Sequence, residues 1–527
     1  MESRTGGAGW WGVSRSAVAG SVVIVLGLVA SACGARVAPY LGAGQGVQAG
    51  SGGTAAGTGS GGSSSVSGGS AGAVGTTPGA GAGSASVTGT GSGGSSASSG
   101  SASSGSASGG GSSAASSSGS VASLTPDNFV YQPAQQAAYC QGTAGNTASA
   151  PGITPTTISL GNVSGITGVL ANNFGQGSQA VQALFSAVNA AGGICGRQLK
   201  LLVEDDGQDA GHNASDIADE IPKVFAFVGS TSDADNGGVQ EMANAGTPDF
   251  GAAINPNRGV SPVYWSPNGA TVFTQNGHPY IYNTLANGLK QAGNFPTKVA
   301  LLAYSVPISA SAAQEFQNMF AQSGASVCFT DYSISPASTS LDQDVLEMKG
   351  KGCTGVFTTL DVTGNAKLLQ AITRQDWKPT FAGTTFDGYT PALISVAGQS
   401  NAQGFEMNLP FLPFNDNNPI VNQYESQLST YEPGQSPSGF GIEGWASAQM
   451  FLYALIKAGR NPTRASLVNV LNAIQTWNTG GATVPITPKL RHPAGPCTMA
   501  VAIKGSDFTR VWPTSGFYCN GQFIRVG

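Results

Sequence analysis

The folded part of this sequence is predicted to be an α/β protein with two lobes, each built on a mostly parallel sheet flanked by helices. Two observations support this prediction. Strand-like apolar runs alternate with helical segments along residues 121–527, which is the pattern of parallel strands joined by helical crossovers. The same stretch, about 400 residues long, is too large for one small hydrophobic core and suits two domains.

Six runs have strand character. They are apolar, short and separated by helical or turn-rich segments, and they read TISLGNV, LKLLVED, VFAFVGS, VALLAYS, ASVCFTDY and GVFTTL. We expect these runs to form parallel sheets, because helical segments lie between them.

Two longer segments have the periodicity of helices with one apolar face. The first ends at Gly192 or Gly193, either of which can adopt the left-handed conformation that ends a helix, and its apolar face comprises Val181, Leu184, Ala187, Val188 and Ala191. The second ends at Gly459 and Pro462, and its apolar stripe comprises Trp445, Ala448, Leu452, Leu455 and Ile456.

Residues 1–33 are predicted to be a signal peptide. Arg4 and Arg15 precede an apolar run that is short for a membrane span and ends in small residues. Cys33 directly follows Ala32, as in the lipobox of bacterial lipoproteins, so we expect lipidation at Cys33 and a lipid anchor on the outer face of the cytoplasmic membrane. Ordinary signal-peptidase cleavage after Ala32 and an uncleaved membrane anchor are the alternatives.

Residues 34–120 are predicted to be a disordered Gly/Ser-rich tether. Positions 41–120 contain 27 Gly and 25 Ser, and no charged residue occurs from Val37 to Pro126. Such a segment cannot bury enough apolar surface to offset its ordering entropy. A flexible chain of about 80 residues has a root-mean-square reach of roughly 50 Å, which could hold a folded domain away from a membrane.

The charge balance argues against nucleic acid as a partner. Only 9% of the residues are charged and the net charge is -5, without basic tracts. Nucleic-acid binding requires a basic surface.

Six cysteines follow Cys33, and an even number in an exported chain indicates disulfides, with fifteen possible pairings. We predict a Cys328–Cys353 bridge, provided that their strands are neighbours, and a Cys497–Cys519 bridge flanking the last strands. The remaining pair is then Cys140–Cys195. Because there is no C-x-x-C motif and the three histidines are scattered, we expect no metal site.

One stretch, VNAAGGICGRQLKLLVEDDGQD at 188–209, indicates a family. With FVGSTSD, TPDFGAAINPN and the late EGWASAQMFLYALIKAG, it resembles the type I periplasmic binding proteins of ABC transporters, specifically the branched-chain amino-acid group. The resemblance covers roughly residues 154–527. The tether and the cysteines lie outside the common pattern.

The resemblance implies two lobes joined by a multi-segment hinge that closes on a small solute and presents it to a membrane permease. Lobe 1 would comprise 121–285 with part of 415–470, and lobe 2 would comprise 286–414 with part of 471–527. Such a protein is not an enzyme, needs no cofactor and acts as a monomer. Its partners would be a small-molecule ligand and an ABC permease.

In lobe 1 the resemblance places an aromatic cover at Phe174. It assigns recognition of a ligand carboxylate to Ser230, Thr231 and Ser232, just before a helix expected near Asp235, whose free N–H groups would favour an anion. Helix capping is the alternative role of these hydroxyls. The following loop would offer backbone groups of Ala252 and Ala253.

In lobe 2 the sequence departs from the family pattern. The cover residue, often tyrosine in the family, aligns with Ile308, with Tyr304 nearby, and the carboxylate that receives an α-ammonium group aligns with Thr385. Asp361 and Asp387 could replace that carboxylate, although each could equally cap a helix. We therefore do not expect a standard branched-chain amino acid as the ligand.

Glu204, Asp205 and Asp206 end a strand, and we expect turn and capping roles for them rather than catalysis. Three functions remain: capture of an amino acid or related small carboxylate for an ABC importer, ligand sensing with the same fold, and exported hydrolysis. The third is disfavoured because the folded part lacks a P-loop, an H-E-x-x-H motif and a nucleophile elbow.

Overall fold

The structure of the protein is a computed structural model, which describes residues 124–135, 140, 145–168, 170–269, 273–488 and 495–527. The expected signal peptide, the lipidation at Cys33 and the tether at 34–120 lie outside these residues. The described residues all fall within one compact unit, Ser108–Gly527. Among them, no helix is both long enough and apolar enough to span a bilayer.

The first lobe is built on a five-stranded parallel sheet with the order β2-β1-β3-β4-β5. Three of its strands were expected from the apolar runs, although β3 begins at Phe227 rather than at Val224. The strand bounds are β1 Thr157–Ser164, β2 Gln198–Asp205, β3 Phe227–Ser230, β4 Asp249–Gly251 and β5 Tyr264–Trp265.

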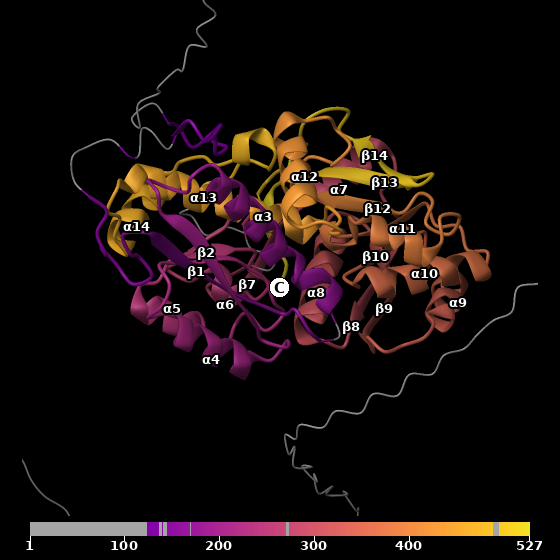
Figure 1. Ribbon diagram of the computed structural model, residues 1–527. Helices are drawn as coiled ribbons and strands as arrows, with labels where there is room; N and C mark the ends of the chain where they lie inside the picture. Colours follow the sequence, from indigo (N-terminus) through magenta and orange to yellow (C-terminus); the bar gives the residue numbers. More distant parts are fainter. Residues whose placement is uncertain (1–123, 136–139, 141–144, 169, 270–272, 489–494) are drawn as a thin grey trace, which may run out of the picture. The chain divides into compact units, whose positions relative to one another are not determined.

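Helices α3 and α13 lie side by side against this sheet, although they are far apart in the sequence (Figure 1). Helix α3 ends where predicted, since Gly192 and Gly193 follow it with φ angles of 99° and 71°. The helices of this lobe are α2 Ala171–Phe174, α3 Gln176–Ala190, α4 Ala210–Glu220, α5 Val239–Ala245, α6 Pro256–Gly259, α12 Pro419–Tyr431, α13 Gly439–Ala458 and α14 Arg464–Ala473.

Helix α13 is buried on all sides rather than along one stripe. Every residue from Gly439 to Ile456 is buried, because the helix packs against α3, α14, β3 and β4. A helix that is apolar around its whole circumference is typical of such a central position. The predicted stripe was therefore only part of the contact surface.

The second lobe is built on a seven-stranded sheet with the order β14-β13-β12-β11-β10-β8-β9. Strands β8 to β12 pair in parallel, whereas β13 and β14 are antiparallel, so the sheet is mostly parallel, as predicted. Their bounds are β8 Lys298–Tyr304, β9 Ser326–Ile334, β10 Gly355–Thr358, β11 Phe381–Thr384, β12 Glu406–Leu409, β13 Met499–Lys504 and β14 Asp507–Trp512.

Both faces of this second sheet are covered. In β8, Val299 and Leu301 belong to one hydrophobic cluster and Ala300 and Leu302 to another, because successive side chains of a strand point to opposite faces. The remaining helical segments are α7 Thr284–Ala292, α8 Pro307–Gln322, α9 Asp342–Gly350, α10 Val362–Arg374, η2 Phe386–Gly388, α11 Pro391–Ala397 and η3 Thr479–Gly481.

A third, antiparallel sheet was not expected from the sequence. It has the order β15-β7-β6, with bounds β6 Phe273–Gln275, β7 His278–Tyr282 and β15 Phe523–Arg525. Its strands are short, and β15 joins the C-terminal end of the chain to a segment that precedes the second lobe.

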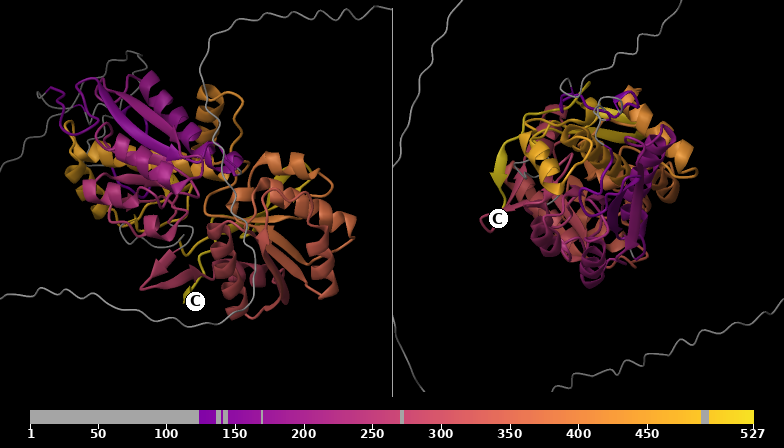
Figure 2. Two further views of the ribbon diagram at one scale, coloured as in Figure 1. Left: turned by 90° about the horizontal axis from the view of Figure 1, so that it is seen from below. Right: turned by 60° about the vertical axis from the view of Figure 1, so that its left-hand side comes forward.

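The chain passes between the two large sheets in three places: between β5 and β8, between β12 and α12, and between α14 and β13. As a result, α13 of the C-terminal part packs against β3, β4 and α3, and its yellow-orange ribbon lies among the violet and magenta elements of the first lobe (Figure 2). Such connecting segments can serve as a hinge between two lobes, because a few loop residues can absorb the rotation.

The three predicted disulfides are confirmed, as Cys140–Cys195, Cys328–Cys353 and Cys497–Cys519. The second pair was predicted on the condition that its strands are neighbours, but β8 lies between β9 and β10. The bridge still forms because Cys328 is the extra residue of a β-bulge in β9 and Cys353 lies in the turn before β10. Their Cα atoms are 5.7 Å apart.

Candidate ligand-binding site

A cavity of about 70 Å³, here called the cleft cavity, is lined by residues of both lobes. From lobe 1 it receives side chains of the segment before α3 and of the loops after β3 and β4. From lobe 2 it receives side chains of α8 and of the loops after β8, β10 and β11. The lining residues are Leu170, Phe174, Asp233, Ile254, Tyr304, Ile308, Ser309, Ala312, Phe316, Thr359, Asp361, Thr385, Asp387 and Phe440.

This placement follows from the topology, because the carboxyl ends of neighbouring parallel strands meet at one edge of a sheet. Strands β8, β10 and β11 are adjacent in the second sheet. Ile308, Asp361, Thr385 and Asp387, which the sequence indicated, all follow these strands and line the cleft cavity. Their role in binding remains a prediction.

Aromatic rings form part of the cavity wall. The ring of Phe174 lies 5.4 Å from that of Phe440, and Phe440 in turn lies 5.2 Å from Phe386. All three side chains are buried. Phe174, expected as an aromatic cover, therefore packs against the first turn of α13 and joins the two lobes through Phe440.

Three carboxyl groups line this largely apolar cavity: Asp233 from lobe 1, and Asp361 and Asp387 from lobe 2. Among the lining residues that the structure describes, none is Lys, Arg or His. The three acids do not form a group able to hold a metal ion, and no such group occurs elsewhere in the described part of the chain.

The surroundings of two of these acids change their acidity. Burial, followed by the nearby charge of Asp206, raises the pKa of Asp233 to about 6. Burial also raises the pKa of Asp387 to about 6, with a further contribution from the charge of Asp361. Both groups are therefore mainly ionised at neutral pH, and a cation in the cavity would stabilise their charged form.

Asp361 has two structural partners. It caps α10 by accepting a hydrogen bond from the backbone N–H of Gly364 at 2.7 Å, and it accepts another from the hydroxyl of Tyr304 at 2.5 Å. The capping role that the sequence left open is thus present. One oxygen, Oδ1, serves both contacts, and a ligand could still approach the other.

Ser230, Thr231 and Ser232 do not line the cleft cavity. All three are buried, and their hydroxyls have partners inside lobe 1. Ser230 accepts from the backbone N–H of Val163 at 3.2 Å, and Ser232 accepts from that of Ala234 at 3.0 Å. The hydroxyl of Thr231 donates to the carbonyl of Gly229 at 3.4 Å.

Ala252 and Ala253 also lie outside the residues lining the cavity. The backbone N–H of Ala253 donates to the hydroxyl of Tyr264 at 2.7 Å. The carbonyl of Ala252 accepts a long hydrogen bond, 3.4 Å, from Arg258. These backbone groups therefore serve the packing of lobe 1 in this structure.

The helix expected near Asp235 begins later, at Val239, so its N-terminus does not lie at Ser230–Ser232; that expectation was wrong. Residues 233–236 form a turn instead. The reason is that Asp235 is engaged in tertiary contacts: it accepts from the backbone N–H groups of Ile254 and Asn255 and pairs with the buried Arg258.

Two of the three acids at the end of β2, Asp205 and Asp206, have structural roles, as expected. Asp205 accepts hydrogen bonds from the backbone N–H groups of Ile166 and Thr167, which fixes the loop after β1. Asp206 accepts from Asn213 and from the backbone of Gln208. Asp206 is fully buried, however, which differs from the solvated strand end that was expected.

Several lining residues were missed. Asp233 follows the expected hydroxyls directly, and its clustering with Asp235 in TSDAD was a usable signal. Phe440 and Phe316 had no such signal, because they reach the cavity only through the packing of α13 and α8 between the lobes.

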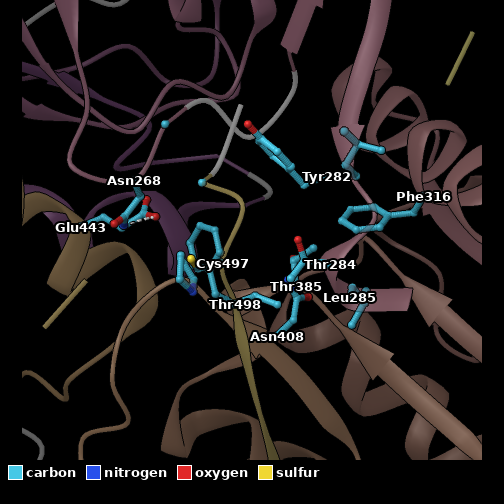
Figure 3. Close-up of a pocket in the computed structure, with 15 residues that line it drawn as sticks. Asn268, Tyr282, Thr284, Leu285, Phe316, Thr385, Asn408, Glu443, Cys497 and Thr498 are labelled. Carbon is cyan, nitrogen blue, oxygen red and sulfur yellow. Dashed lines mark hydrogen bonds between the residues drawn. The ribbon is translucent and has the colours of Figure 1, made fainter. Parts of the chain in front are cut away.

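A second cavity, of about 100 Å³ and here called the hinge cavity, lies next to the first: Phe316 and Thr385 line both. Its wall includes residues of the connections between the lobes, such as Asn268 and Thr498. Figure 3 shows its lining, which consists of Asn268, Gly269, Ile281, Tyr282, Thr284, Leu285, Phe316, Thr385, Phe386, Asn408, Pro410, Glu443, Gly495, Cys497 and Thr498.

The hinge cavity contains a buried acid. Glu443, on α13, accepts a hydrogen bond from the side-chain amide of Asn268 at 2.8 Å, the dashed contact in Figure 3. Burial, with a smaller contribution from the charge of Asp387, raises the pKa of Glu443 to about 8. Glu443 is therefore mainly protonated at neutral pH.

Two lobes with a cavity between them are the architecture of a protein that binds a ligand by closure. The sequence indicates the same class. The profile of the periplasmic binding protein family matches residues 157–507, so the chain belongs to that family. It is a solute-binding protein of extracytoplasmic type. No curated protein sequence is significantly similar to the chain.

Solved structures show the same fold at low sequence identity. A fatty acid ABC transporter substrate-binding protein from Thermomonospora curvata has a TM-score of 0.60 at 19% identity, covering 71% of this chain and 95% of that one. A branched-chain amino acid substrate-binding protein from Streptococcus pneumoniae in complex with isoleucine has a TM-score of 0.56 at 15% identity, covering 70% and 100%. A branched-chain amino acid ABC transporter protein from Thermus thermophilus with bound valine has a TM-score of 0.57 at 14% identity, covering 69% and 97%.

Proposed function

We propose that the protein captures a small solute that combines a protonated amine with an apolar body, amino acids among them, and delivers it to the permease of an ABC importer. The observation that carries this proposal is the charge of the cleft cavity. Asp233, Asp361 and Asp387 line an otherwise largely apolar wall, and none of its described lining residues is basic.

The preference for a cation follows from electrostatics. A carboxylate removed from water must be compensated by an opposite charge or by hydrogen bonds, or else it takes up a proton. The raised pKa values of Asp233 and Asp387 indicate that the surrounding protein compensates their charges only in part. An ammonium group would supply both a positive charge and hydrogen-bond donors. A second carboxylate at the same place would be repelled.

Closure is the proposed response to binding. The cleft cavity takes residues from both lobes, so a solute in it contacts both at once and stabilises the arrangement in which the lobes approach. Binding by closure requires no chemical conversion of the solute, and we assign no catalytic role.

An amino acid would bring a carboxylate as well as an amine. For that group Ser230–Ser232, Ala252 and Ala253 remain the predicted contacts by resemblance to the family. Their side chains or backbone groups would have to exchange internal hydrogen bonds for contacts with the ligand.

The proposal includes attachment to the membrane and a permease as partner. Lipidation at Cys33 would hold a monomer at the outer face of the cytoplasmic membrane, where the permease is. A ligand sensor of the same fold is the alternative, and stimulation of a reconstituted permease–ATPase complex by the loaded protein distinguishes transport from sensing.

Native mass spectrometry of the purified folded part tests the ligand class directly. The small molecule released on denaturation is treated with an amine-specific reagent. We expect a co-purified compound that reacts. A compound without an amine, such as a fatty acid, would contradict the proposal.

A further inference from the structure

The hinge cavity contains polar atoms for which the structure shows no partner. Within the described part of the chain, four buried side-chain oxygens of its lining have no hydrogen-bond partner. One is the hydroxyl of Thr385, and three are carboxyl or amide oxygens: Oε2 of Glu443, Oδ1 of Asn268 and Oδ1 of Asn408. Glu443 and Asn268 are only 4% and 3% exposed. Buried polar atoms are almost always paired, so four that line one cavity indicate that something with donors occupies it.

Two other hydroxyls of the wall have partners in the protein. The hydroxyl of Thr284 donates to the carbonyl of Pro496 at 2.9 Å, and that of Thr498 donates to the carbonyl of Leu409 at 3.0 Å. The remaining surface is mainly apolar, including Ile281, Leu285 and Phe386. The cavity therefore presents acceptor oxygens on an apolar wall and suits an apolar chain ending in a donor group.

The hinge cavity also adjoins the cleft cavity. Phe316 and Thr385 belong to both walls. The charge of Asp387, in the cleft cavity, affects the pKa of Glu443 in the hinge cavity, so the two carboxyl groups lie within electrostatic reach of each other. A molecule held at Asp387 could thus extend past Thr385 toward Glu443.

We propose that the hinge cavity binds the far end of an elongated solute and that this end carries a second amine, held by Glu443, Asn268 and Asn408. This inference rests on the proposed function, which places the first amine at the acids of the cleft cavity. The substrate class is then an alkyl chain with a hydrogen-bond-donating cation at each end, of which an alkyl diamine is the simplest example.

Calorimetric titration with matched amines tests the inference. The probes are the diamines putrescine, cadaverine and hexamethylenediamine, each compared with the monoamine of equal chain length. We expect at least one diamine to bind about tenfold or more tightly than its monoamine, the gain typical of a charge-assisted hydrogen bond. The gain should disappear in Glu443→Gln, which keeps the shape and the contact with Asn268.

The controls separate the possible failures. Glu347→Gln, which removes an exposed carboxylate on α9, should keep the gain. Asn408→Leu, which removes another of the three oxygens and fills part of the cavity, should reduce the gain and provides the test if Glu443→Gln does not fold.

Each outcome has a defined meaning. If the monoamines bind but no diamine gains affinity, or if the gain survives in Glu443→Gln, the hinge cavity holds only water and the inference is overturned while the proposed function stands. If neither monoamines nor diamines bind, the proposed function fails first and the inference with it.

Discussion

The guanidinium of Arg258 forms two parallel hydrogen bonds with the carboxylate of Asp249, each 2.8 Å long, and both side chains are almost fully buried. Arg258 also contacts Asp235 at 3.1 Å and the carbonyl of Ser230 at 3.1 Å. One side chain thus connects the ends of β3 and β4 with the turn that carries Asp233 into the cleft cavity.

We therefore predict that Arg258→Met lowers the free energy of unfolding by about 3–5 kcal/mol, because it leaves two buried carboxylates without their cation. Denaturant unfolding followed by circular dichroism measures the change. Lys351→Met, which breaks the exposed pair with Glu347 on the second lobe, is the matched control and should cost about 1 kcal/mol or less. Equal costs for the two variants would show that the Arg258 network contributes little.

Removal of the Cys328–Cys353 bridge should lower stability without changing the fold. The bridge closes a loop with a sequence separation of 25. Replacing both cysteines by alanine should lower the free energy of unfolding by about 3 kcal/mol, mainly because the unfolded chain gains conformational entropy. Thermal unfolding of the variant measures the loss. Free thiols at these positions in native protein, found by non-reducing peptide mapping, would show that the bridge does not form.

The pH dependence of stability should reveal the buried carboxyl of Glu443. Its pKa is higher in the folded protein, about 8, than its ordinary value of 4.5, so the folded state holds the proton more tightly. The contribution of this carboxyl group to the free energy of unfolding is therefore fully present below pH 4.5. It is lost as the pH rises through about 8.

Glu443→Gln has no such proton to lose. The difference in the free energy of unfolding, variant minus wild type, should therefore be larger at about pH 9 than at about pH 5, by on the order of 3 kcal/mol. Melting curves at both pH values give the comparison. The exposed Glu347→Gln should follow the wild type. A Glu443→Gln variant that also follows the wild type would mean that Glu443 titrates normally.

A pair of ligands with and without a carboxylate can distinguish two roles of the hydroxyls in the loop after β3: binding of the ligand and capping. If the loop after β3 receives the anionic end of an amino acid, Ser232→Ala should weaken norleucine binding by about tenfold or more. Binding of pentylamine, which lacks the carboxylate, should be unchanged. Ser230→Ala should in addition cost about 1–3 kcal/mol of stability, because the buried N–H of Val163 loses its acceptor. Equal affinity of the wild type and both variants for norleucine would place the anionic end elsewhere.

Much of the fold was predictable because its longest elements have strong local signals. Strands such as β1 and β2, each eight residues long, and helix α3 with its terminal glycines follow from periodicity and turn chemistry. Strands β4 and β5 have only three and two residues, and they escaped notice because so short a run has no usable period.

Site residues that follow the ends of strands could be predicted from the sequence. Site residues that are placed by packing between the lobes could not. Asp361 and Asp387 line the cleft cavity because they follow neighbouring parallel strands. The helix expected near Asp235 failed because Asp235 bonds to Ile254 and Arg258, partners about twenty residues away that no local pattern reveals. Glu443 was missed for a similar reason, since Asn268 is 175 positions away.

The central claim is that the cleft cavity recognises a cation on an apolar body. Calorimetric titration with matched pairs, ethylamine to hexylamine against acetate to hexanoate, tests it most directly. We predict that amines bind, that alkanoates of the same length do not, and that Asp387→Asn weakens the amines by about tenfold or more while Glu347→Gln leaves them unchanged. Binding of the alkanoates with equal or higher affinity, undiminished in Asp387→Asn, would contradict the account.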